Sequence, residues 1–256
     1  MTPDLGAPDL SAIEAFLRRA PYLHAYELGD LDPRELVHTT WFAGHPVDAV
    51  ALLYRGLATP TLIALDHDAP AAAHALVAGL DALPARFYAH LTPGLEAALA
   101  PRFHGALLGH HLKMALPTPL ADADDDQVTR LAPGDAAEAL AFYAASYPTS
   151  FFESVSLERG PYLAIRDGAG LAAIAGTHVY SPAKRVASLG NIATRPDARG
   201  RGHARRVTAA LCRLLSREVD IIGLNVRGDN AAAIACYRAI GFEVRHPYDE
   251  WLFTAR

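Results

Sequence analysis

The sequence predicts an α/β (α+β) fold made of two domains, and three observations predict it. Strand-like apolar runs alternate with segments whose apolar residues recur at helical spacing. A segment rich in proline and aspartate, residues 116–126, interrupts this order near the middle of the chain. A strand, a glycine- and arginine-rich loop and an amphipathic helix follow one another at residues 187–215, and the first half has no such loop.

The length of the chain, 256 residues, fits two domains of roughly 120 residues each, close to the commonest domain size. Residues 116–126 contain two prolines and four aspartates, so they continue neither a helix nor a strand and are typical of a solvated linker. We therefore expect one domain at residues 1–120 and a second at residues 121–256.

In the first domain, Ser11 and Glu14 form a capping box before Ile13, Phe16 and Leu17 on one helical face. Strand-like and helical patterns then alternate. The expected strands are residues 47–54, 61–65, 86–91 and 105–116, and the expected helices are residues 71–83 and a short one after Pro93.

The second domain follows the same alternation. Residues 162–166 and 171–180 form a hairpin pattern around the turn at residues 167–170. Gly228, Asp229 and Asn230 supply turn and N-cap chemistry, and Gly241 is placed to end a helix. The other expected strands are residues 127–131, 187–194, 221–226 and one after Phe242, and the other expected helices are residues 136–145 and one behind the loop.

The loop at residues 191–204 is suited to binding phosphate. Its glycines let the backbone approach a ligand, and the following helix N-terminus presents N–H groups to an anion. Five arginines lie between Arg195 and Arg206, although the formal net charge of the chain is -5. An exposed surface loop is the alternative. A Rossmann dinucleotide site is disfavoured because Arg205 stands where its third glycine is required.

Two motifs here resemble the GNAT acyltransferases, a superfamily that uses coenzyme A. Arg199, Gly202 and Ala204 follow its pyrophosphate-binding pattern, Arg-x-x-Gly-x-Ala, and residues 221–242 follow the order of elements that closes its fold. The resemblance covers residues 127–256. It implies a mixed, mostly antiparallel twisted sheet flanked by helices.

The first half resembles a second GNAT-type domain without the cofactor loop, as in tandem members of the superfamily. This likeness rests on the order of elements and on residues 26–31, which resemble glycine N-acyltransferase-like members. An unrelated α/β domain remains the alternative.

The resemblance assigns the donor site to acetyl-CoA or another acyl-CoA. It implies that Ile192, Ala193 and Thr194 pair with pantetheine, and that Asn230 binds the pantetheine or phosphate region. Tyr237 would protonate the departing thiolate, a role that suits a hydroxyl with an ordinary pKa of about 10. A half-buried packing role is the alternative for Tyr237. The residues expected to wrap the pyrophosphate are Arg199, Gly200, Arg201, Gly202, His203 and Ala204.

On the acceptor side, Glu153 and His178 are the candidates for a base or water relay, because an amine must lose a proton to attack a thioester. The segment after the first helix of the C-terminal domain would wall the acceptor pocket. Core packing is an alternative for Phe151, and local backbone contacts are an alternative for Asn191. The expected substrate-binding residues are Tyr147, Phe151, Asn191 and Tyr180.

Several other classes are disfavoured. No window approaches about 18 uninterrupted apolar residues, and residues 1–4 lack signal-peptide features, so we expect a bacterial-type cytoplasmic protein without membrane association. Cys212 and Cys236 fall on apolar parts of helices and are expected to be free buried thiols. The histidines lack metal-ligand spacing, so no metal is expected. The net charge disfavours nucleic acid.

The sequence thus predicts an acyl-CoA-dependent N-acyltransferase that transfers acetyl to a small primary amine or amino-acid-like substrate in a ternary complex. The alternative is a non-catalytic protein that binds or senses coenzyme A. A monomer or homodimer is expected. The acceptor, the acyl length, the existence of a dedicated base and the role of the N-terminal domain stay open.

Overall fold

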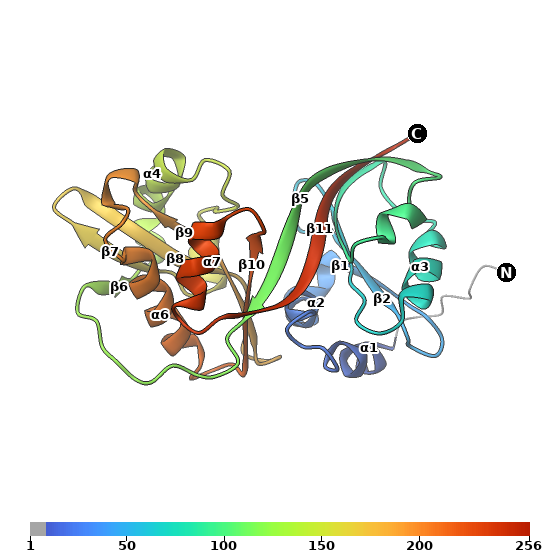
Figure 1. Ribbon diagram of the computed structural model, residues 1–256, viewed down its shortest axis with the longest axis horizontal. Helices are drawn as coiled ribbons and strands as arrows, with labels where there is room; N and C mark the ends of the chain where they lie inside the picture. The colour runs from blue at the N-terminus through green and yellow to red at the C-terminus, as the bar shows by residue number, and fades with distance from the viewer. Residues whose placement is uncertain (1–8) are drawn as a thin grey trace. The chain divides into compact units, whose positions relative to one another are not determined.

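The computed structural model describes residues 9–256, so the segment on which the prediction about a leader rests, residues 1–4, lies outside the described residues. The chain forms two compact units (Figure 1). The N-terminal unit comprises the residues up to Lys113 together with Val226–Asp229 and Arg245–Arg256. The C-terminal unit comprises Met114–Asn225 and Asn230–Val244.

The N-terminal unit has a mixed sheet in the order β1-β2-β3-β4-β11-β5. β1 pairs with β2, β2 with β3 and β4 with β11 in antiparallel fashion, whereas β3 and β4 run parallel. Its strands are β1 Thr39–Ala43, β2 Val50–Tyr54, β3 Thr61–Ala64, β4 Arg86–Leu91, β5 Phe103–Ala115 and β11 Glu243–Ala255, and its helices are α1 Leu10–Leu17, α2 Ala25–Asp30, η1 Leu36–His38, α3 Pro70–Ala78 and η2 Leu95–Ala98.

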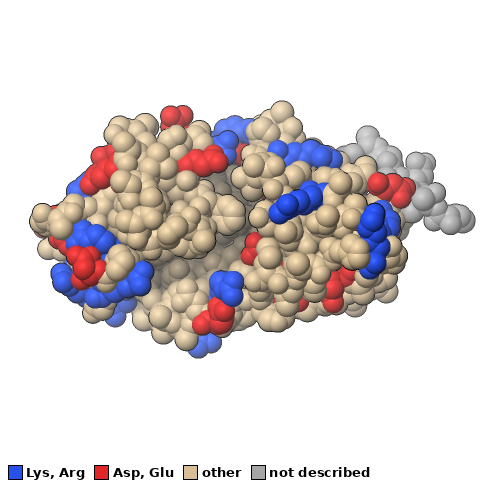
Figure 2. Space-filling view, turned by 90° about the horizontal axis from the view of Figure 1, so that it is seen from above, with Lys and Arg blue, Asp and Glu red and all other residues tan. Residues whose placement is uncertain are grey.

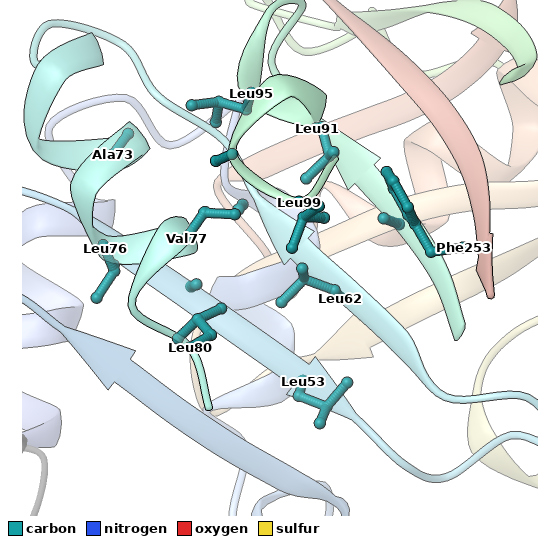
Figure 3. Close-up of a cluster of buried hydrophobic side chains, with 14 of the residues drawn as sticks. Leu53, Leu62, Ala73, Leu76, Val77, Leu80, Leu91, Leu95, Leu99 and Phe253 are labelled. Atoms are coloured by element: carbon teal, nitrogen blue, oxygen red, sulfur yellow. The ribbon is translucent and has the colours of Figure 1, made fainter. Parts of the chain in front are cut away.

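The core of this unit lies between the sheet and α3. Leu76, Val77 and Leu80 belong to the same buried cluster as Leu53 of β2 and Leu62 of β3 (Figure 3). Four of the five residues of β2 are buried, which explains why this strand is a continuous apolar run rather than an alternating one.

β11 corrects the predicted division of the chain. The sequence analysis assigned residues 121–256 to one domain, but Arg245–Arg256 belong to the N-terminal unit. β11 pairs with β4 from Asp249↔Leu91 to Thr254↔Arg86, and the Phe253 ring stacks on Phe87 at 5.4 Å. A strand's own pattern does not specify its partner strand, so sequence order alone assigned β11 to the wrong unit.

Two local predictions for the N-terminal unit also differ from the structure. The N-cap of α1 is Asp9, whose side chain accepts from the amides of Ser11 and Ala12, whereas Glu14 pairs with Arg18. The capping box was therefore wrong, because a carboxylate two residues earlier satisfies the same helix N-terminus. α2 and β1 were not predicted as elements, since each is too short for a clear periodic signal.

The C-terminal unit has the sheet order β10-β9-β8-β7-β6, in which only β9 and β10 run parallel. The predicted mixed, mostly antiparallel sheet flanked by helices is confirmed. α6 lies against β6, β7, β8 and β9, and α4 lies against β8 and β9 (Figure 1). The elements are β6 Val128–Arg130, η3 Pro133–Asp135, α4 Ala136–Ser146, α5 Ser156–Arg159, β7 Leu163–Asp167, β8 Gly170–Ser181, β9 Val186–Thr194, η4 Pro196–Ala198, α6 His203–Leu215, β10 Ile221–Arg227 and α7 Ala231–Arg238.

Candidate active site

The two parallel strands of the C-terminal unit, β9 and β10, stop pairing beside the glycine-arginine loop. Their register runs from Ile221↔Val186 to Leu224↔Leu189 and ends there, whereas β9 continues to Thr194. The edge of β9 beyond Leu189 therefore lacks a strand partner on the β10 side. Its backbone groups are available to an extended ligand that lies along them.

At the same level, β8 and β9 are distorted by two bulges. Gly176 faces Gly190 and Ile174 faces Ala193, so two residues of β9, Asn191 and Ile192, stand opposite one residue of β8. On the other side of this point, Thr177 faces Leu189 and Val179 faces Ser188, which leaves His178 as an extra residue of β8. Bulges of this kind redirect side chains and are common beside active sites.

His178 lies directly over Gly190. A β-carbon added to Gly190 would stand 2.2 Å from the His178 Cδ2 atom, so the imidazole fills the space that the glycine leaves. The Phe151 ring is perpendicular to the imidazole at 6.4 Å. The His178 side chain is exposed to solvent, yet the protein around the ring desolvates the cation and so lowers the pKa of the imidazole; the nearby Asn191 side chain opposes this shift.

Asn191 is buried within the bulge. It is 4% exposed and has a φ of 52°, a left-handed conformation that few residues other than glycine adopt. Tyr143 donates its hydroxyl to the Asn191 carbonyl at 2.6 Å, and the Asn191 side-chain amide donates to the Tyr162 hydroxyl at 2.9 Å. The hydroxyl of Tyr162 donates in turn to the Thr177 carbonyl at 3.1 Å.

The loop after β9 contains the two glycines that its geometry requires. Gly200 has a φ of 77° and Gly202 a φ of 78°, so both adopt the left-handed backbone that glycine tolerates at little cost. Gly202 is the N-cap of α6 and supplies no side chain, and the first helical bond runs from the Arg206 amide to the Gly202 carbonyl. The preceding amides of the first turn therefore have no acceptor within the helix.

Not all of the predicted basic cluster is available to a ligand. Arg195 pairs with Asp167 and Asp197 and also donates to the Leu171 carbonyl, and Arg206 pairs with Asp125. In the face drawn in Figure 2, most Lys and Arg side chains are scattered in small groups, several of them beside Asp or Glu. Within residues 9–256, three arginines of the cluster form no ion pair with a carboxylate: Arg199, Arg201 and Arg205. Of these, Arg199 donates to the Thr194 carbonyl at 3.3 Å and Arg201 to the Asp197 carbonyl at 3.1 Å.

Two buried polar atoms beside the loop lack a hydrogen-bond partner among the described residues. They are the Thr194 hydroxyl at the end of β9 and the Nδ1 atom of His203 at the start of α6. Together with the open helix amides and the three arginines that no carboxylate neutralises, they fit a diphosphate ester whose attached chain follows β9. These groups suit the coenzyme A end of an acyl donor.

α7 contributes the remaining two donor-side candidates. Asn230 is the N-cap of this helix, and its side-chain oxygen accepts from the Ala233 amide at 3.1 Å. This bond gives Asn230 a structural role, while its amide group stays available for the expected ligand contact. Tyr237 is 8% exposed and lies 6.0 Å from the Phe242 ring. Burial raises the pKa of Tyr237, so its hydroxyl stays protonated at neutral pH; nearby Cys236 and Tyr147 add to the shift.

The acceptor-side candidates are placed less uniformly. Phe151 is 63% exposed beside His178, and Tyr147 ends α4 with 40% exposure within electrostatic reach of Tyr237. Glu153 is exposed between α4 and α5, where its backbone groups bond Ser156. The hydroxyl of Tyr180 is hydrogen-bonded to Glu218, which follows α6. Of these residues, Phe151 and His178 contact each other through their rings, whereas Tyr180 is bonded to Glu218 instead.

Sequence reasoning missed Tyr143 and Tyr162. Both are almost fully buried, at 3% and 1% exposure; the Tyr143 ring stacks on Phe152, and the Phe152 and Tyr162 rings meet edge to face. The sequence contains no signal for their hydroxyl contacts, because an aromatic residue at core spacing predicts only packing.

Neither cysteine of this unit is set up for nucleophilic chemistry. Burial raises the pKa of the Cys212 thiol to about 12 and also raises that of the Cys236 thiol, so neither is an activated nucleophile. Between residues 9 and 256 no three His, Cys, Asp or Glu side chains are grouped to hold a metal ion. In the same range, every helix is too short or too polar to cross a membrane.

Comparisons with known proteins point to one family. Residues 163–252 match the FR47-like protein family. A mycothiol acetyltransferase from Tsukamurella paurometabola is 36% identical over 91 residues, which are 32% of this chain and 31% of that protein. The chain thus aligns with less than a third of the length of this relative.

Solved structures extend the similarity over both units. A putative GNAT-family acetyltransferase from Novosphingobium aromaticivorans has a TM-score of 0.60 and 23% identity, covering 80% of this chain and 88% of its own. A GCN5-related N-acetyltransferase from Kribbella flavida has a TM-score of 0.61 and 19% identity, covering 90% and 95%. A tandem GNAT protein from the clavulanic acid biosynthesis pathway has a TM-score of 0.52 and 19% identity, covering 97% and 96%. At these identities, the similarity establishes the fold.

Proposed function

We propose that this chain, which belongs to the GNAT acyltransferase superfamily through its C-terminal unit, is an acyl-CoA-dependent N-acyltransferase that transfers an acetyl group to a small primary amine. The observation that carries the proposal is the parting of β9 from β10 at Leu189, immediately before the loop that ends at the open N-terminus of α6. This arrangement offers one ligand an extended backbone edge and an anion site in succession.

In the proposed binding mode, the pantetheine arm lies along Ile192, Ala193 and Thr194. The buried Thr194 hydroxyl then gains a polar partner. Arg199 and Arg201, together with the first-turn amides of α6, neutralise the diphosphate.

The proposed reaction is direct. The amine nitrogen forms a bond to the thioester carbonyl carbon, the carbon–sulfur bond breaks, and the coenzyme A thiolate leaves. The thiolate takes a proton from the Tyr237 hydroxyl, which burial keeps protonated at neutral pH. The attacking amine gives up its proton to a base or through water. Neither Cys212 nor Cys236 takes part, since a raised thiol pKa opposes a covalent intermediate.

His178 is the stronger of the two candidate bases. It sits at the bulge beside the β9 edge, and its lowered pKa keeps the imidazole neutral at pH 7, so that it can accept a proton. Glu153 is not placed at the bulge. It lies in an exposed loop, where its backbone is hydrogen-bonded to Ser156.

The N-acetyltransferase activity is tested by free-thiol release from several acyl-CoA thioesters against a broad panel of amines. Because residues of this chain align with a mycothiol acetyltransferase, the acceptor of that enzyme belongs in the panel. We expect acetyl-CoA to be used by the wild-type protein. Absence of thiol release with every pair would contradict the enzymatic function.

Replacing Tyr237 by Phe separates an enzyme from a coenzyme A sensor. We expect Y237F to lower kcat by about 10²- to 10⁴-fold, as for loss of a general acid, with an unchanged Kd for acetyl-CoA measured by calorimetry. A matched control is Y54F, which removes a hydroxyl bonded to Glu35 in the N-terminal unit and should leave turnover unchanged. Full turnover in Y237F would exclude the proposed role of this tyrosine.

A further inference from the structure

We propose that Tyr143 and Tyr162 are positioning residues for acyl transfer, whose hydroxyls hold Asn191 in its left-handed conformation and so fix the bulge of β9 on which the acyl thioester lies. The inference rests on the proposed function, because it concerns the same acyl-CoA site. Neither tyrosine needs to touch the donor, since both act through Asn191.

The conformation of Asn191 needs external support. A left-handed backbone is strained for any residue other than glycine, because the β-carbon crowds the following carbonyl oxygen, and asparagine is among the few residues that tolerate it. Within residues 9–256, Arg185 is the one other non-glycine residue with positive φ. Asn191 is 4% exposed, so protein contacts rather than water must compensate for the strain.

Tyr143 holds the backbone of Asn191. Its hydroxyl donates to the Asn191 carbonyl at 2.6 Å, and this carbonyl belongs to the peptide group that continues to Ile192. The Tyr143 ring is fixed by stacking on Phe152, with centroids 4.6 Å apart. Burial raises the pKa of Tyr143, so its hydroxyl remains a donor throughout the neutral range.

Tyr162 holds the side chain of Asn191 and joins the two bulges. Its oxygen accepts from the Asn191 side-chain amide at 2.9 Å and donates to the carbonyl of Thr177 at 3.1 Å. Thr177 precedes His178, the extra residue of β8, and Asn191 follows Gly190, on which the imidazole rests. One buried hydroxyl therefore links the β9 edge to the candidate base.

The Tyr162 ring cannot move aside easily. It is 1% exposed, and its Cε1 atom would stand 2.0 Å from a β-carbon on Gly176, so it fills the space above that glycine. Because the ring is held in place, its hydroxyl is also held where it bonds the Asn191 side chain. The bulge is then already formed before the donor binds, which reduces the entropy lost on binding.

The two tyrosines make contacts that a double-mutant cycle distinguishes. Tyr143 bonds a backbone atom, which survives in Asn191→Gly, whereas Tyr162 bonds the side chain, which that substitution removes. Glycine also adopts a φ of 52° without strain. If the hydroxyls act through Asn191, Y162F has a smaller effect in the N191G background, where only its bond to the Thr177 carbonyl is left to lose, while Y143F keeps its effect.

The experiment measures the Kd of acetyl-CoA by calorimetry, and the KM values of acetyl-CoA and acceptor, for full-length wild type, Y143F, Y162F, N191G and the two double variants. We expect Y143F to raise the Kd and KM of acetyl-CoA about five- to tenfold, the effect of losing one buried hydrogen bond, with the acceptor KM unchanged. Y162F should raise them at least as much, because its hydroxyl makes two such bonds. The fold-change from N191G to N191G/Y162F should be smaller than that from wild type to Y162F.

Y54F is the matched control, since it removes a tyrosine hydroxyl bonded at 2.9 Å to Glu35 in the N-terminal unit. It should lower the melting temperature without changing the Kd of acetyl-CoA. Should Y162F fail to fold, N191A replaces it: alanine loses the same side-chain bond and keeps the strain, so it should bind acetyl-CoA more weakly than N191G.

An equal effect of Y162F in both backgrounds, or a fall in melting temperature with an unchanged Kd, would overturn the positioning role while leaving the proposed function intact. Failure of the wild-type protein to bind any acyl-CoA is a separate result. It would overturn the proposed function, and the inference with it.

Discussion

The imidazole of His178 occupies the position in which a side chain at Gly190 would begin, with three ring atoms within 2.3 Å of an ideal β-carbon. Gly176 stands in the same relation to Tyr162, whose Cε1 atom would lie 2.0 Å from its β-carbon. A ring thus fills the space above each glycine, but the two rings differ in how far they can move. His178 is exposed, whereas Tyr162 is 1% exposed within the core.

We expect Gly190→Ala to cost activity rather than stability. The exposed imidazole can rotate away from the new methyl group, which removes it from the bulge. Turnover of acetyl-CoA should therefore fall about tenfold or more, as for a misplaced base, while the melting temperature changes little. The measurements are steady-state kinetics and thermal unfolding.

Gly176→Ala is the matched comparison. The Tyr162 ring has nowhere to go, so overpacking should destabilise the C-terminal unit by about 1–3 kcal/mol in denaturant unfolding. A G190A protein with wild-type kinetics would exclude a role for the present position of His178.

The pH dependence of turnover should reflect the environment of His178. Desolvation lowers the pKa of this imidazole, and a base must be neutral to accept a proton, so activity rises with pH through a midpoint that lies below the ordinary pKa of about 6.5. We therefore expect the acidic limb of the kcat profile to lie below pH 6.5 and to disappear in His178→Gln. An identical limb in H178Q would assign the ionisation to another group, with Glu153 as the next candidate for substitution.

The buried carboxyl of Asp30 lowers the stability of the N-terminal unit at neutral pH relative to an uncharged side chain at this position. This carboxyl is 8% exposed at the end of α2, and burial together with Glu27 and Glu35 raises its pKa well above the ordinary value. Because the pKa of this carboxyl is higher in the folded state, its contribution to the free energy of unfolding is fully present below the unfolded-state pKa of about 4. This contribution is lost as the pH rises through the folded-state pKa. We expect Asp30→Asn to be more stable than wild type at pH 7, by an amount that shrinks towards pH 4.

Asp32 supplies the control for this prediction. It is 3% exposed but accepts from the Arg34 side chain at 2.9 Å and from the Arg34 amide at 3.0 Å. Asp32→Asn should therefore destabilise the protein, by about 1–3 kcal/mol, in the same denaturant titration. If D30N is less stable than wild type at pH 7, the buried carboxyl makes a favourable contact that outweighs its desolvation.

Local chemistry is the part of this molecule that the sequence predicts well. The positive φ values of Gly200 and Gly202 follow from a loop that must turn sharply before a helix, and Asn230 caps α7 as its side chain indicates. Strand β4 has the bounds that its alternating pattern predicts. Each of these features depends on neighbouring residues alone, which is why residue type and spacing suffice.

Contacts between distant segments are the part that the sequence does not contain. The bond of Tyr143 to Asn191 spans 48 positions, and that of Asn191 to Tyr162 spans 29. The loss of Arg195 and Arg206 from the basic cluster depends equally on remote partners, Asp167 and Asp125. Counting five arginines therefore overstated the charge available to a phosphate.

The pairing of β11 gives the last prediction. Phe253 is 1% exposed, stacks on Phe87 at 5.4 Å and meets Phe103 at 6.4 Å, so Phe253→Ala removes a large side chain from the core of the N-terminal unit (Figure 3). We expect the free energy of unfolding of this unit to fall by about 3–5 kcal/mol. The loss of hydrogen-exchange protection should be confined to β2, β3 and β4. The exposed neighbour Thr254→Ala should cost less than about 1 kcal/mol. Because the residues proposed to bind acyl-CoA all lie in the C-terminal unit, F253A should bind acetyl-CoA with the wild-type Kd. Loss of protection in β8 and β9 instead would show that β11 stabilises the C-terminal unit, as the sequence order had predicted.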